Sequence, residues 1–273
     1  MIMRGIIMIT EMLSLTFMQR AIAASLMVAI LGGYFGAFVV QRGLSFLGNG
    51  LAHAAFGGVA LGILLRQEPL YMAVPFTLIV SLLIVWLKDH TLLGSDTVIG
   101  ILFALSMAMG SIFLSMTPGY AGDAFGYLFG SLLSVTKADL WVTAGVMVLA
   151  LGTIPAWGRW ASATFDRELA MAEGMPCQRD DYVLAAALAV TTVVSMKVLG
   201  ITLVAAFLVI PSASARLVSR TFASMTLLGM VFAVVGSLLG LVVSYSVDWP
   251  SGPSIILVQT AMFAACMLVG RRG

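Results

Sequence analysis

The stretch ASMTLLGMVFAVVGSLLGLVVS, residues 223–244, decides the fold class. It carries no charged side chain, and its length matches the roughly 20 apolar residues with which a helix crosses a hydrocarbon core about 30 Å thick. A helix satisfies its own backbone hydrogen bonds, as a chain inside lipid must. The stretch therefore predicts a membrane-spanning helix.

Similar apolar stretches recur along nearly the whole chain of 273 residues. The chain is 61% hydrophobic and 10% charged, with a mean hydropathy of +1.08, which excludes a soluble globular domain. We predict an all-α polytopic membrane protein of about eight or nine transmembrane helices, folded as a single transmembrane domain over residues 1–273. The candidate spans are 21–40, 44–65, 69–87, 97–116, 140–157, 182–197, 199–215, 223–244 and 253–269.

Two segments do not fit full spans. Residues 118–136 are interrupted by glycine and are predicted to form short or re-entrant helices. Residues 1–20 lack a signal cleavage site, and their last part, EMLSLTFMQR, is predicted to lie along the membrane interface as an amphipathic segment in contact with lipid.

The basic residues predict the orientation. Counting gaps between spans, nine basic residues fall on one side and five on the other, so the richer side is expected to be cytoplasmic, with the N-terminus outside and the C-terminus inside. The net charge of +2 is too small to indicate a nucleic-acid partner. Cys177 and Cys266 lack the spacing of a disulfide framework or a thiolate metal site.

The longest polar interval, residues 158–181, falls on the cytoplasmic side. Asp166 is expected to cap a short helix there, Leu169 and Ala170 to be buried, and Gly174 to end the helix. The helix either docks a cytosolic partner or belongs to an ordinary solvated connection.

A polar stripe crosses the second span. In the region around GNGLAHAAFGG, residues 48–58, polar or small residues recur every four positions at Ser45, Asn49, His53 and Gly57. Such a stripe should face the bundle interior or a watery path. The His53 imidazole suits zinc and other transition metals, and the Asn49 carbonyl is a weak neutral ligand. The alternative is that both side chains hydrogen-bond neighbouring helices.

Two acidic residues are further candidates for cation handling. Asp96 stands where a span begins and either caps that helix or contributes a ligand. Asp123 lies in the glycine-broken region on the outer side, where a carboxylate could receive an entering cation.

Catalytic motifs are missing from the sequence. No lysine follows the glycine-rich pattern of a P-loop, and neither HExxH nor GxSxG occurs. We therefore expect a transporter rather than an enzyme, with energy supplied by a partner or by an ion gradient.

Several ordered motifs resemble the permease subunits of bacterial zinc and manganese ABC importers. They are FMQRA (17–21), RGLSFLGNGLAHAAFGGVALG (42–62), SDTVIGILFA (95–104), GYLFGSLLSVT (126–136), LGITLVAAFLVIPSASARL (199–217) and SGPSIIL (251–257). The resemblance covers nearly the whole chain.

The resemblance implies a type II importer permease, homodimeric in the bacterial inner membrane, that moves zinc or manganese, or iron, by alternating access. It implies a separate cytosolic ATPase that binds ATP and an extracytoplasmic metal-binding protein, with no cofactor held by this chain. The coupling helix would include Asp166, Glu168, Leu169, Ala170 and Gly174.

His53 matches the histidine of the family's translocation path. The family commonly carries aspartate four residues earlier, where this chain has Asn49. Loss of that negative charge weakens the attraction of a divalent ion in a medium of low dielectric constant. Two alternatives remain: a permease for a metal chelate or a cobalamin-like substrate, and a secondary transporter, which the scarcity of intramembrane carboxylates disfavours.

Overall fold

The computed structural model describes residues 14–117 and 134–270. In these two segments, nine helical stretches are long and apolar enough to cross a membrane, and they coincide with the predicted spans. The all-α fold class is confirmed. The elements are α2 (Thr16–Gln41), α3 (Leu47–Leu64), α4 (Pro69–His90), α5 (Ser95–Ser115), α7 (Lys137–Leu151), η2 (Ile154–Ala156), α8 (Trp157–Phe165), α9 (Arg167–Ala172), α10 (Cys177–Leu199), α11 (Ile201–Val218), α12 (Phe222–Val247) and α13 (Ser251–Gly270).

The first helix begins earlier than predicted. Helix α2 starts at Thr16, and within its first turn Met18 is 4% exposed in the main core, whereas Phe17 is 42% exposed. The interfacial segment predicted from the last part of residues 1–20 overlaps this turn, and its place at the membrane surface stays a prediction. Residues 1–13, and residues 118–133 with the predicted re-entrant helices and Asp123, lie outside the described residues.

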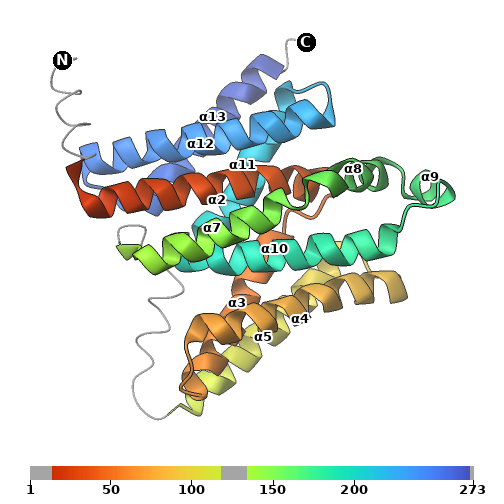
Figure 1. Cartoon of the computed structure of the whole chain (residues 1–273), viewed down its shortest axis with the longest axis horizontal. Coiled ribbons are helices and arrows are strands. Elements are labelled where there is room, and N and C mark those ends of the chain that lie inside the picture. Colours follow the sequence, from red (N-terminus) through yellow and green to blue (C-terminus); the bar gives the residue numbers. More distant parts are fainter. Residues whose placement is uncertain (1–13, 118–133, 271–273) are drawn as a thin grey trace.

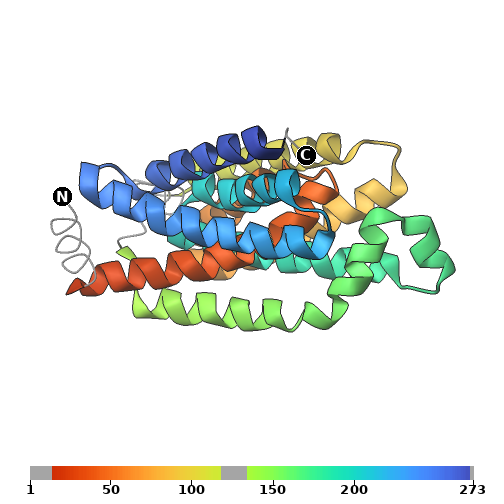
Figure 2. The same cartoon turned by 90° about the horizontal axis from the view of Figure 1, so that it is seen from above.

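The long helices run roughly side by side between two ends of the bundle (Figures 1 and 2). We call one end the α9 end, because α9 and its connections project from it, and the opposite end the Glu68 end, after the residue that precedes α4. Helices α2, α4, α11 and α13 finish at the α9 end.

The helices pack as two units. Helices α3, α4 and α5 pack against one another, and α2, α11, α12 and α13 form the second unit (Figure 1). Helix α10 contacts members of both units, and α3 also contacts α11. Relative movement of the two units must therefore act on the contacts of α10 and α11.

Glycines allow the closest helix approaches. A Cβ on Gly36 would overlap the Leu208 backbone oxygen, and a Cβ on Gly58 would lie 2.5 Å from the Ala73 Cα. In lipid, where no hydrophobic force draws helices together, such backbone contact supplies much of the association energy. Helices α2 and α11, and helices α3 and α4, are thus tightly packed within one chain.

An ionic cluster joins three helices at the Glu68 end. Lys197 Nζ, near the end of α10, lies 3.0 Å from Asp139 Oδ1 on α7 and 3.8 Å from Glu68 Oε1. Asp139 also completes a capping box with Thr136, whose hydroxyl accepts a hydrogen bond from the Asp139 amide. The cluster fixes the start of α7 next to α10.

Candidate functional site

The candidate site lies on α3, which packs among α4, α5 and α11. From Leu47 to Ala60 every residue of this helix is buried except Asn49 and His53, which are half-buried. The two side chains stand one helical turn apart on the same face. They form a partly open polar strip in an otherwise enclosed helix.

The His53 ring is held by an aromatic neighbour. It meets Phe103 of α5 edge to face, with ring centroids 4.9 Å apart and an interplanar angle of 86°. Its Nδ1 atom is buried and has no hydrogen-bond partner within the described residues. Buried polar atoms are normally paired, and no interhelical hydrogen bond through Nδ1 within the described residues accounts for this one.

The structure does not bring Asp96 to His53. Asp96 is exposed in the first turn of α5, seven residues before Phe103, which corresponds to about 10 Å along a helix. Nor is it the capping residue: the N-cap is Gly94, without a side-chain hydrogen bond, so the negative charge of Asp96 acts on the helix dipole instead. Across residues 14–117 and 134–270, no three His, Cys, Asp or Glu side chains gather closely enough to hold a metal ion.

The predicted helix in the polar interval is present as α9. The Asp166 carboxylate accepts a hydrogen bond from the Leu169 amide at 2.9 Å, which confirms the predicted cap. Gly174 adopts φ = +78°, and the Met175 amide donates to the Ala170 oxygen at 3.0 Å, so the chain leaves the helix in a Schellman turn.

Burial on α9 differs from the prediction at one position. Ala170 is 1% exposed, as expected, but Leu169 is 56% exposed. Consecutive residues on a helix point about 100° apart, so a helix of this length that rests on the bundle at Ala170 turns Leu169 outward. Met171, which is 51% exposed, and Glu168 are exposed with it. The result is a small apolar surface with an acidic edge at the α9 end.

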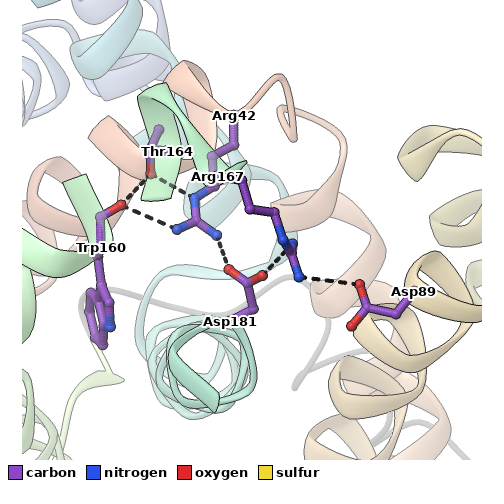
Figure 3. A network of polar contacts seen from close by, with 6 residues as sticks. All are labelled: Arg42, Asp89, Trp160, Thr164, Arg167 and Asp181. Carbon is purple, nitrogen blue, oxygen red and sulfur yellow. Dashed lines mark hydrogen bonds and ion pairs between the residues drawn. The ribbon is translucent and has the colours of Figure 1, made fainter. Parts of the chain in front are cut away.

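A polar network beside α9 was not predicted from the sequence (Figure 3). Arg42, which follows α2, lies with Nη1 2.5 Å from Asp181 Oδ1 on α10. Its Nε donates to Thr164 Oγ1 at 2.9 Å, and Nη2 donates to the Trp160 backbone oxygen at 3.4 Å. One guanidinium thus joins α2, α8 and α10.

The second half of the network begins at the other oxygen of Asp181. Arg167 of α9 donates from Nη1 to Asp181 Oδ2 at 2.6 Å, and its Nη2 lies 3.6 Å from Asp89 Oδ1 on α4. The sequence does carry a signal for this pairing, since both aspartates stand at ends of spans. Hydropathy patterning assigns the basic residues only a role in setting topology, so it does not reveal their partners.

Comparison with known proteins places this architecture in a family. The ABC 3 transport family model matches residues 14–270. The manganese transport system membrane protein MntC of Halalkalibacterium halodurans is 33% identical over 255 residues, covering 93% of this chain and 87% of MntC. The high-affinity zinc uptake system membrane protein ZnuB of Haemophilus influenzae is 30% identical over 253 residues, covering 92% of this chain and 97% of ZnuB.

A solved structure agrees. PsaBC from Streptococcus pneumoniae in complex with Fab matches with a TM-score of 0.83 and 31% identity, covering 97% of this chain and 95% of that chain. The resemblance inferred from the motifs is confirmed. The chain is a multi-pass membrane protein that belongs to the ABC 3 transport family.

Proposed function

We propose that this chain is the permease subunit of an ATP-driven importer of a divalent transition-metal ion, zinc or manganese, with iron as a further candidate. The observation that carries the proposal is the strip of Asn49 and His53, the two half-buried residues in a stretch of α3 that is otherwise buried. An imidazole nitrogen without a protein partner among the described residues and an amide oxygen one turn away suit a soft or borderline cation.

The strip of Asn49 and His53 is suited to transient binding of an ion in transit rather than to tight, lasting binding. It offers two neutral ligands per chain, and no group of three His, Cys, Asp or Glu side chains that could hold a metal ion occurs among the described residues. A site in a transport path must bind strongly enough to admit the ion and weakly enough to release it. In a homodimer, two such strips facing each other would supply two imidazoles and two amides to one cation moving by alternating access.

The test is uptake of zinc and of manganese into vesicles that contain the chain with its candidate ATPase and its candidate extracytoplasmic metal-binding protein. We expect uptake of one metal that requires both ATP and the binding protein. Uptake by the purified chain without ATP would contradict the proposal and favour a secondary transporter, and uptake of a chelate but not of the bare ion would favour the chelate alternative.

The exposed surface of α9 is proposed to dock the ATPase. Changing Leu169 to serine removes an apolar side chain that is 56% exposed on α9, so we expect the complex with the ATPase to weaken by about 2 kcal/mol, the loss typical of an interface hot spot. The measurement is the affinity of the purified ATPase for the permease in detergent or nanodiscs.

The matched control is Leu92→Ser. Leu92 is a fully exposed leucine in the connection between α4 and α5, at the same end of the bundle but on another element. The Leu92→Ser variant should leave the affinity of the ATPase for the permease unchanged. Equal weakening by both variants would indicate a general effect of a more polar surface and would rule out α9 as the specific docking element.

Restoring a carboxylate at position 49 should tighten metal binding. The Asn49→Asp variant places a negative charge one turn from His53, and charge-assisted attraction in a medium of reduced dielectric constant should raise the affinity for the divalent ion about tenfold. The affinity can be measured by isothermal titration of the purified permease. Ser45→Asp, one turn earlier at an exposed position before α3, is the control for a long-range charge effect and should change the affinity little.

A further inference from the structure

The polar network at the α9 end connects elements of both packing units. Arg42 follows α2 in the unit of α2, α11, α12 and α13, whereas Asp89 lies at the end of α4 in the unit of α3, α4 and α5. Between them stand Asp181 on α10 and Arg167 on α9. The network therefore joins the proposed ATPase-docking helix to both units at once.

Asp181 is the centre of this arrangement. Each of its two carboxylate oxygens is taken by a different arginine, at 2.5 Å for Arg42 and 2.6 Å for Arg167 (Figure 3). The side chains of Asp181 and Arg42 are 11% and 13% exposed, so both charges are largely removed from water. Charge-assisted hydrogen bonds of this length are directional and resist displacement.

The four charged side chains sum to zero, with two arginines facing two aspartates. A buried ion pair contributes little net stability, because desolvation offsets most of the Coulombic attraction. Stability alone is therefore a weak explanation for the cluster. Its geometry is better explained by a requirement to keep specific elements in register.

Arg42 is connected to the candidate metal strip through the short turn between α2 and α3. Arg42 is the C-cap residue of α2, and the Leu44 amide donates to the Val39 oxygen at 2.8 Å, so the chain turns tightly here before α3 begins at Leu47. Asn49 follows in the first turn of α3. A guanidinium held at three points thus fixes the turn from which the strip extends.

Asp89 is connected to the same strip through the packing of α4 along α3. Asp89 lies in the last turn of α4, and α4 packs along α3. A cavity of about 50 Å³ lies beside Asp89, Asp181 and Lys88 and extends to Leu47 at the start of α3. Its volume exceeds that of one water molecule, so the network is not closely packed on this side.

We infer that Asp181, Arg42, Arg167 and Asp89 form a positioning relay, which transmits movement of α9 to the start of α3 and the end of α4. The inference rests on the proposed function. When the ATPase displaces α9, Arg167 pulls on Asp181 and Asp89 together, and Asp181 acts in turn on Arg42. These residues position the helices and do not touch the transported ion.

The test uses the complete reconstituted transporter and measures the amount of metal transported per ATP hydrolysed. The variants are Asp89→Asn, Arg167→Gln and the double variant. We expect both single variants to assemble and hydrolyse ATP while the transport ratio falls about threefold to tenfold, a loss typical of residues that modulate coupling between sites. The double variant should be no worse than the poorer single variant, because both substitutions remove the same ion pair between Arg167 and Asp89.

The matched control is Glu68→Gln, the same carboxylate-to-amide change at the opposite end of α4. Glu68 is 49% exposed and lies 3.8 Å from Lys197, which keeps its contact with Asp139. This variant should retain the wild-type ratio. An Asp89→Asn ratio equal to wild type, an equal loss in Glu68→Gln, or multiplicative effects in the double variant would each overturn the relay.

Two further outcomes distinguish the relay from a role of these residues in folding or docking. Arg167 lies on α9, so Arg167→Gln could lose transport simply because it no longer binds the ATPase. In that event the transport ratio of Asp89→Asn tests the relay. Loss of assembly in Asp89→Asn would overturn the relay, since Asp89 would then act in folding or docking. Absence of ATP-dependent metal uptake in the wild type would refute the proposed function itself.

Discussion

Replacing His53 with alanine is expected to reduce ATP-dependent metal uptake by at least about tenfold, because loss of residues that merely support a metal ligand already costs about 10- to 100-fold. The ring is the stronger donor of the half-buried strip, and its Nδ1 has no protein partner within the described residues. The measurement is initial uptake rate in reconstituted vesicles at saturating ATP, normalised to the amount of assembled complex.

The chain supplies its own control in its second histidine. His90 is exposed in the last turn of α4, where its ring stacks on Trp86 with centroids 4.8 Å apart. His90→Ala should therefore transport at the wild-type rate. Normal uptake by His53→Ala would contradict the site assignment and leave His53 as a packing residue against Phe103.

The largest effect on stability is expected at Gly36. A Cβ there would overlap the Leu208 backbone oxygen and would lie 2.6 Å from Ser212 Oγ. Helix propensity favours alanine over glycine by about 1 kcal/mol, whereas overpacking costs about 1–3 kcal/mol and more where backbone must move. Because α11 would have to shift, we expect Gly36→Ala to lower the free energy of unfolding by about 2 kcal/mol.

The control for this substitution is Gly145→Ala in α7. Gly145 is exposed, and no heavy atom of the described residues outside its local helix backbone lies within 4 Å of the added Cβ. Only the propensity difference acts there, so stability should rise by up to about 1 kcal/mol. Denaturant titrations of both variants in mixed micelles provide the comparison, and unchanged stability in Gly36→Ala would show that α2 and α11 separate without cost.

The sequence is sufficient to locate the spans, because each lipid-crossing helix satisfies its backbone internally and contains roughly 20 apolar residues. The helix ends are predicted less accurately. Hydropathy starts the span of α10 at residue 182, whereas the helix begins at Cys177. Its first turns contain Asp180 and Asp181, whose charges look unsuited to a span until their arginine partners are known.

The candidate site could be predicted only in part. The spacing of Asn49 and His53 along one helix is local, and periodicity reveals it. The contact of His53 with Phe103 and the pairing of Arg42 with Asp181 join residues on different helices, far apart along the chain. Such contacts depend on how several helices pack, which hydropathy along one chain does not encode.

The outward-facing Leu169 and Met171 on α9 also have a consequence for biosynthesis. On the proposed docking of the ATPase at α9, a newly inserted subunit without that partner leaves these side chains uncovered, and exposed apolar groups attract chaperones and proteases. Cells that make the two subunits in unequal amounts should therefore degrade the surplus permease. The same few side chains would then serve as a degradation signal that keeps subunit supply in balance.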